Sequence, residues 1–145
     1  MKKQEYLDLR SRHQKEFDEF PIAYAFNDEQ LKEALTKLNA TADECITVFG
    51  HGDVVKRENA DALIALLDRQ QEELLQHLKD DPEFAEAAFG YEMDNHEYAI
   101  NWAGDEDVLD CFGITFEKIN RWGLQHAWST ARRKHMEHAK KWGMI

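Results

Sequence analysis

The stretch Asp81–Trp102, DPEFAEAAFGYEMDNHEYAINW, decides the fold because its apolar period changes part-way along. Asp81-Pro82 is typical of a helix start, since an Asp side chain can cap free backbone N–H groups and a Pro at the first helical position loses no hydrogen bond. Apolar side chains then recur every three or four residues, which predicts one buried helix face ending near Asp94-Asn95. From Tyr98 to Trp102 large side chains alternate with smaller ones, which predicts a strand with one apolar face.

On the N-terminal side of this stretch, apolar periods, β-branched runs and turn residues predict three helices and three short strands. The predicted elements are a helix over 2–19, a strand over 22–26, a helix over 27–38, strands over 45–49 and 54–56 joined by a turn at 50–53, and a long helix over 59–79.

On the C-terminal side, Asp105 can cap a short helix that Gly113 ends, and Thr115 can cap a final helix over about 116–141 with a bend at Gly123. Runs of helix around a few short strands indicate the α+β class. We therefore expect a single compact acidic domain over residues 1–145. It would hold a small, mostly antiparallel sheet of three to four strands, packed by about six helices.

The composition is that of a folded globular protein, with 145 residues, 43% hydrophobic and 11% aromatic. No apolar run approaches the roughly 20 residues of a membrane span, and the polar start is unlike a signal peptide. Cys45 and Cys111 are isolated and belong to no CxxC pair, which is typical of reduced thiols. We therefore expect a cytoplasmic protein that does not bind a membrane.

Charge is unevenly distributed along the chain. Residues 118–145 hold seven Lys/Arg and one acid, a net of +6, whereas residues 1–117 hold eleven Lys/Arg and twenty-eight acids, a net of −17. A body this acidic repels nucleic acid and favours a basic protein partner. Two interpretations remain open: an ordinary solvated surface, or a surface that imitates nucleic acid and docks in a basic groove.

Two short polar motifs could carry chemistry. In Gly50–Asp53 the glycines would let a ligand approach the backbone, and His51 beside Asp53 could ligate a metal or move a proton. An ordinary hairpin turn has the same residues, and the phosphate-binding patterns GxxxxGK[ST] and GxGxxG are absent. The second motif, Asn95-His96-Glu97, gathers metal-capable side chains, but helix capping and a strand entry explain them equally well.

The last helix offers two further features. His135 and His138 are three residues apart and could share an ion, although they fall on the apolar stripe of the helix, where histidines mostly pack. Basic residues flank two tryptophans, an arrangement that can bind a partner or dock on the protein's own acidic body. These possible partner-binding residues are Arg132, Arg133, Lys134, Lys140, Lys141, Trp128 and Trp142.

Five segments together resemble a family of small uncharacterised proteins carried on bacterial plasmids, prophages and other mobile elements. The segments are 20–30, 50–53, 89–92, 95–98 and 109–113. The resemblance covers roughly residues 5–120, and Asn95–Tyr98 is its most specific part. It brings no activity or site residue with it. It implies a setting, because small accessory proteins of such elements often act by binding host machinery.

The leading functional prediction is a non-enzymatic, cofactor-free binding protein whose acidic surface occupies a basic groove of a host protein complex, as an anti-CRISPR or anti-restriction inhibitor would. The alternative is a metal-dependent hydrolase or nucleotide-processing enzyme using the His51/Asp53 and His96/Glu97 region, although no nucleophile pattern such as GxSxG supports it. A third hypothesis is a homo-oligomer formed through the terminal helix. Direct binding of nucleic acid is not expected.

Overall fold

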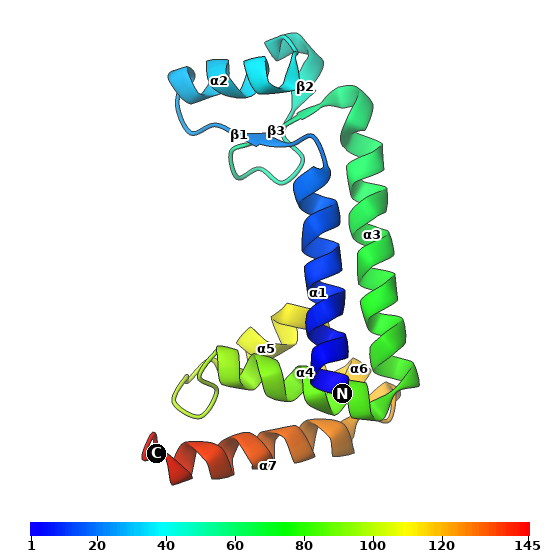
Figure 1. The fold of residues 1–145 in the computed structure, drawn as a ribbon, viewed down its shortest axis with the longest axis vertical. Coiled ribbons are helices and arrows are strands. Elements are labelled where there is room, and N and C mark those ends of the chain that lie inside the picture. Colours follow the sequence, from blue (N-terminus) through cyan, green and yellow to red (C-terminus); the bar gives the residue numbers. More distant parts are fainter. The chain divides into compact units, whose positions relative to one another are not determined.

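The computed structural model describes residues 1–145 and has seven α-helices and a three-stranded antiparallel sheet (Figure 1). This confirms the α+β class. The elements are α1 (Lys2–Glu19), β1 (Ala23–Tyr24), α2 (Asp28–Leu38), a 3₁₀ turn (Ala42–Glu44), β2 (Cys45–Ile46), β3 (Asp53–Lys56), α3 (Arg57–Asp80), α4 (Pro82–Asn95), α5 (Gly104–Phe112), α6 (Phe116–Arg121) and α7 (Gln125–Lys141). None of these helices combines the length and apolar character that crossing a membrane requires.

The residue contacts divide the chain into two compact units. Unit 1 consists of Met1–Arg10 and Gln71–Ile145, and unit 2 consists of Ser11–Gln70. Each unit buries its own apolar side chains. A single domain over residues 1–145 stays a prediction.

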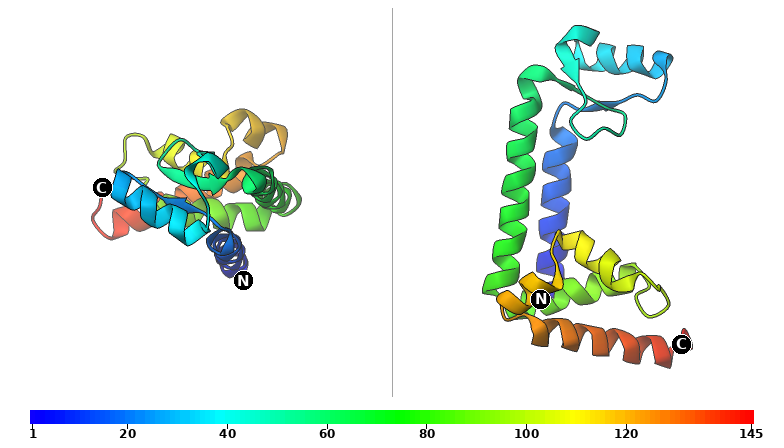
Figure 2. Two further views of the ribbon diagram at one scale, coloured as in Figure 1. Left: turned by 90° about the horizontal axis from the view of Figure 1, so that it is seen from above. Right: turned by 180° about the vertical axis from the view of Figure 1, so that it is seen from behind.

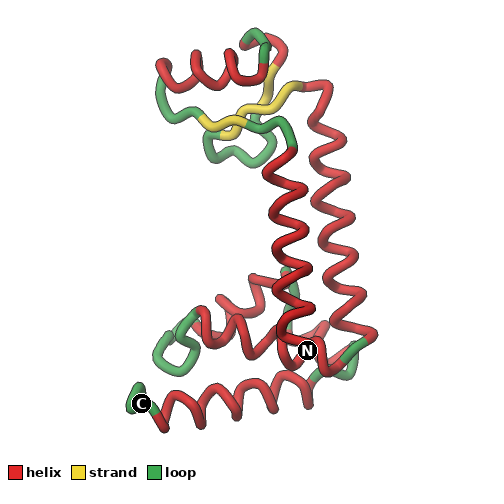
Figure 3. The backbone as a smooth tube through the Cα atoms, in the orientation of Figure 1, coloured by secondary structure: helices red, strands yellow, loops and turns green.

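Unit 2 is built on the sheet, in the order β1-β3-β2, with both pairs antiparallel (Figure 3). The predicted strands 22–26 and 45–49 are each only two residues long. Successive residues of a strand point to opposite faces, and β3 uses this alternation to build two small cores. Val54 packs with Ala34 and Leu38 of α2, whereas Val55 packs with Leu63 of α3.

The core of unit 1 surrounds α4, as the opening stretch predicted. Asp81 accepts hydrogen bonds from the backbone N–H groups of Glu83 and Phe84, so it caps the helix that Pro82 begins. Phe89 is fully buried and packs edge-to-face on Trp128 of α7, with 5.2 Å between ring centroids. Helices α4 and α7 consequently lie side by side (Figures 1 and 2).

The strand predicted from Tyr98 to Trp102 is wrong. Glu97 adopts a left-handed conformation with φ 52°, and the Tyr98 N–H donates to the Met93 carbonyl to close α4. The N–H groups of Ile100 and Asn101 both donate to the Glu97 carbonyl, so the backbone bonds locally rather than to a partner strand. The segment 96–103 is therefore a loop of tight turns, which we call the 96–103 loop.

The predicted final helix is also divided, because Gly123 breaks it instead of bending it. Gly123 has φ 69°, a left-handed conformation that glycine adopts without steric cost. The Leu124 N–H donates to the Ile119 carbonyl and ends α6. Helix α7 then starts at Gln125, and its axis need not continue that of α6.

Candidate functional site

Glu92 places a carboxylate in the apolar core of unit 1, where it is only 2% exposed. The Tyr6 hydroxyl of α1 donates to Glu92 Oε2 at 3.1 Å. Arg10 Nη1 lies 3.7 Å from Oε1, but Oε1 itself accepts no hydrogen bond. A buried carboxylate with an oxygen left unsatisfied is costly, so this residue requires an explanation.

His96 and Cys111 complete a polar cluster around this carboxylate. His96 follows Glu92 by four residues, so both side chains lie on one face of the end of α4. Helix α5 brings Cys111 Sγ to 3.2 Å from His96 Nε2. One donor atom from each of the three residues lies within 4.8 Å of the other two. We call Glu92, His96 and Cys111 the Glu92 cluster.

The thiol of this cluster is not an activated nucleophile. Burial and, second to it, the negative charge of Glu92 together raise the pKa of Cys111 to about 12. The thiol is therefore protonated at neutral pH and also donates to the Asp107 carbonyl at 3.3 Å. Because only a thiolate is strongly nucleophilic, the geometry does not favour covalent catalysis by Cys111.

His135 forms a second buried polar contact, between α7 and α4. Its Nε2 accepts a hydrogen bond from the Ala99 N–H at 3.0 Å, so the ring proton sits on Nδ1 and is donated to Asp94 at 2.6 Å. Both ring nitrogens are thereby used, whereas His138 is exposed. The shared metal site considered for this histidine pair is thus left without a free nitrogen on His135.

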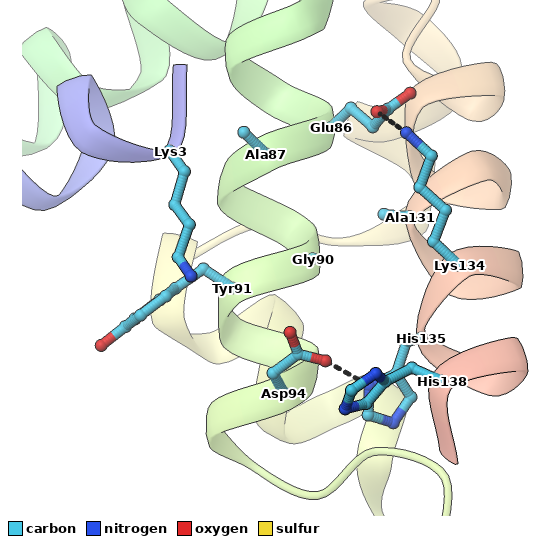
Figure 4. Close-up of a pocket in the computed structure, with 10 residues that line it drawn as sticks. All are labelled: Lys3, Glu86, Ala87, Gly90, Tyr91, Asp94, Ala131, Lys134, His135 and His138. Carbon is cyan, nitrogen blue, oxygen red and sulfur yellow. Dashed lines mark hydrogen bonds and ion pairs between the residues drawn. The ribbon is translucent and has the colours of Figure 1, made fainter. Parts of the chain in front are cut away.

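A shallow groove of about 300 Å³ lies between α4 and α7 (Figure 4). Small residues, Gly90 and Ala131 among them, form its centre. Lys134 pairs with Glu86 across the groove at 2.8 Å, and Asp94 is held by His135, as the dashed lines in Figure 4 show. Because these charged groups already pair with one another, we interpret the groove as a result of helix packing and not as a ligand site.

Asp53 organises a turn in unit 2. It is buried, and its carboxylate accepts hydrogen bonds from the Thr47 hydroxyl and from the backbone N–H groups of Val48, Phe49 and His51. Burial alone would raise its pKa, but these hydrogen bonds, that from Phe49 foremost, outweigh burial and lower the pKa to about 2. The carboxylate is saturated by its own turn, and the His51 side chain is exposed.

Comparison with known proteins places the chain in a family. Residues 5–134 match the sequence profile of a family of unknown function (DUF7659). The protein belongs to this family. No curated protein and no solved structure matches the chain. The expected resemblance to an uncharacterised family is therefore confirmed, whereas an origin in mobile elements stays a prediction.

The polar residues Asn95, His96 and Glu97, which the sequence singled out, do not gather in one place within unit 1. His96 belongs to the Glu92 cluster, whereas Asn95 and Glu97 are exposed. Sequence reasoning missed Glu92 and Cys111. The spacing of Glu92 and His96, four residues apart on a helix, was a usable signal, but the position of Cys111 depends on how α5 packs.

The basic and aromatic residues of α7 divide into two groups. Trp128 is only 7% exposed and belongs to the core, so it is not a contact for a partner. Lys134 pairs with Glu86, and Arg132 Nε donates to the Tyr98 hydroxyl at 3.3 Å. Internal docking thus occupies part of the set. The exposed members without such a contact are Arg133, Lys140, Lys141 and Trp142.

Proposed function

We propose that this protein acts by binding another protein through an exposed apolar surface at one end of unit 1. We call this surface the Trp end. It comprises Ile100 and Trp102 of the 96–103 loop and Trp142, Met144 and Ile145 beyond α7. The observation that carries the proposal is Trp102, whose side chain is 100% exposed, with Ile100 at 55% and Trp142 at 66%. Large apolar groups gathered on a surface mark interaction sites.

The 96–103 loop is held in place, which supports a binding role. The Ala99 N–H is fixed to His135, and the Asn101 side chain bonds to Asp107 and to the Ala103 N–H. Figures 1 and 2 show this loop and the C-terminus at the same end of unit 1. A loop already ordered before binding loses less conformational entropy in a complex, so its contacts yield more affinity.

Charge supports a protein partner with an apolar pocket and an acidic rim. Arg133, Lys140 and Lys141 are exposed on the same helix that ends at Trp142. Tryptophan and arginine are enriched where protein interfaces hold most of their binding energy. Nucleic acid is disfavoured because residues 1–117 carry a net charge of −17, which repels phosphates.

The test is a pull-down from a lysate of the native host, comparing the wild type with a Trp102→Ala, Trp142→Ala double variant. The matched control is Tyr24→Ala, Phe26→Ala, which removes two exposed aromatic side chains from unit 2. We expect the wild type and the control to capture the same partner, and the tryptophan variant to capture at least tenfold less of it.

Capture that does not depend on the two tryptophans would overturn the proposal. Arg133→Glu should weaken the same partner, and added salt should weaken wild-type binding, because salt screens exposed charges. Light scattering gives the remaining outcome. A wild-type dimer that the tryptophan variant disperses would identify the partner as a second copy of this chain.

A second candidate is the acidic anti-defence inhibitor, in which the acidic surface occupies a basic groove of a host nuclease complex. Its support is the charge of residues 1–117 and the acidic helix α5, where Glu106 in the first turn and Asp110 near the end are exposed. Glu106→Gln, Asp110→Asn should then abolish capture, whereas the tryptophan variant should not. The metal-dependent enzyme hypothesis keeps one supporting observation, the place of His96 in the Glu92 cluster.

A further inference from the structure

We propose that Glu92, His96 and Cys111 form a binding site for a divalent cation of the zinc class. This inference is separate from the proposed protein contact, because Glu92 is buried, His96 and Cys111 are half-buried beside it, and none of the three belongs to the Trp end. The sequence marked His96 as metal-capable, but it singled out neither Glu92 nor Cys111.

The chemistry of the three side chains selects the metal. A thiolate, an imidazole and a carboxylate are the three donor types that zinc uses in proteins, whereas calcium and magnesium require oxygen ligands throughout. The Cys111 thiol is protonated before the metal binds, so the cation must displace its proton to solvent and take the resulting thiolate as a ligand. The sulfur favours a thiophilic metal, and Zn²⁺ is the common cation that accepts all three donors in one tetrahedral set. Three protein ligands leave a fourth position for water.

The geometry needs only a small adjustment. Zinc with bonds of about 2.0–2.3 Å holds its tetrahedral ligand atoms roughly 3.3–3.8 Å apart. Cys111 Sγ and His96 Nε2 are already 3.2 Å apart, and the widest separation in the cluster is 4.8 Å. A side-chain movement of about 1 Å therefore completes the set. Glu92 lies in the last turn of α4 and His96 is the C-cap residue of that helix, so one helix end positions two of the three ligands.

The unsatisfied oxygen of Glu92 is an independent sign of a ligand. Tyr6 holds Oε2 through a hydrogen bond and so orients the carboxylate, while Oε1 accepts none. Metal-binding side chains are commonly oriented by such a hydrogen bond on the atom that does not ligate. Arg10 approaches Oε1 to 3.7 Å, but its side chain is 46% exposed and can turn towards solvent when a cation binds.

The two other buried side chains that could ligate a metal, Asp53 and His135, are already satisfied, which singles out this cluster. The Asp53 carboxylate accepts four donors from its own turn, and both ring nitrogens of His135 are bonded. In the Glu92 cluster a nitrogen, a sulfur and a carboxylate oxygen converge, and one oxygen of that carboxylate accepts no hydrogen bond.

The test titrates the metal-free full-length protein with Co²⁺, which substitutes for zinc and reports a thiolate ligand by its charge-transfer absorption. Competition with Zn²⁺ then gives the zinc affinity. We expect one equivalent to bind, with a thiolate band. Cys111→Ser should remove the band and weaken zinc at least about a hundredfold, because even the loss of an orienting residue weakens metal binding about 10–100-fold.

The matched control is Cys45→Ser, which removes the other thiol and should leave the band and the affinity unchanged. His96→Gln should weaken binding as Cys111→Ser does, and Tyr6→Phe, which removes only the hydroxyl, should weaken it about tenfold with the band kept. Circular dichroism is the check that each variant is folded. No stoichiometric binding, or binding that survives Cys111→Ser, would overturn the site.

Discussion

At the scale of single residues, Asp53 is the group whose ionisation matters most for unit 2. Its folded pKa of about 2 lies below the ordinary value of 3.8, so its carboxylate stabilises the fold above that value. This stabilisation is lost as pH falls towards 2. A shift of this size corresponds to about 2 kcal/mol.

We therefore expect Asp53→Asn to lower the free energy of unfolding at pH 7 by about 2 kcal/mol, measured with urea. The difference in free energy of unfolding between the variant and the wild type should fall to about half at pH 3, because the stabilisation by the wild-type carboxylate is then partly lost. Asp61→Asn, at an exposed position on α3, is the control and should stay within about 0.5 kcal/mol at both pH values. A gap that does not change with pH would contradict the role assigned to the charge.

Two glycines of the same turn separate backbone strain from contact. Gly50 and Gly52 both have positive φ, at 77° and 82°. A Cβ on Gly50 would meet nothing within 4 Å, whereas one on Gly52 would lie 2.6 Å from Phe26 Cε1 and 3.0 Å from the Ala25 carbonyl oxygen. We expect Gly50→Ala to cost about 1 kcal/mol and Gly52→Ala about 1 kcal/mol more, by urea unfolding. Equal losses would mean that strain alone decides.

At the scale of elements, most helices were predictable, whereas the break at Gly123 and the loop after α4 were not. Asp81 was expected to cap a helix, and it does so through side-chain hydrogen bonds, as Asn27 does at the start of α2. The alternation from Tyr98 to Trp102 indicated a strand, but a strand needs a partner, and the Glu97 carbonyl bonds the loop to itself. Whether a segment with alternating side chains forms a strand or a loop depends on tertiary contacts such as that between Ala99 and His135. No local sequence pattern encodes these contacts.

The same limit applied to the candidate site. His96 stood out because it has a chemically versatile side chain beside other polar residues. Cys111 looked like an ordinary apolar position on its own helix, and Glu92 looked like one of 29 acids. Only the packing of α5 against the end of α4 brings the sulfur to His96, and that packing follows from the whole core of unit 1.

His135 should be the residue that holds the 96–103 loop on α7. His135→Leu would leave the Ala99 N–H without its acceptor, and a half-buried donor left unpaired costs about 1–3 kcal/mol. We expect that loss in the free energy of unfolding, together with faster hydrogen exchange at Ala99. The control is His138→Gln on the same helix, where the side chain is exposed and the change should be within about 0.5 kcal/mol. Equal effects would contradict the anchoring role.

At the scale of the whole molecule, the division of contacts raises the question of whether the chain unfolds in one step. Helices α1 and α3 each contribute residues to both units, whereas the apolar clusters belong to one unit or the other. Regions that share few contacts often open separately in native-state hydrogen exchange. Continuous helices work against this separation, because they couple the two ends of each helix.

Asp53→Asn decides between these behaviours, since its whole effect originates in unit 2. If the two units open separately, the backbone amides of residues 11–70 will exchange faster in the variant. Buried α4 amides such as that of Phe89 will then keep wild-type protection. The matched reciprocal variant is His135→Leu, which should act on unit 1 and spare the amide of Val55. If either variant lowers protection equally in both units, the two helices transmit the loss, and the chain is the single cooperative domain that its length and composition predicted.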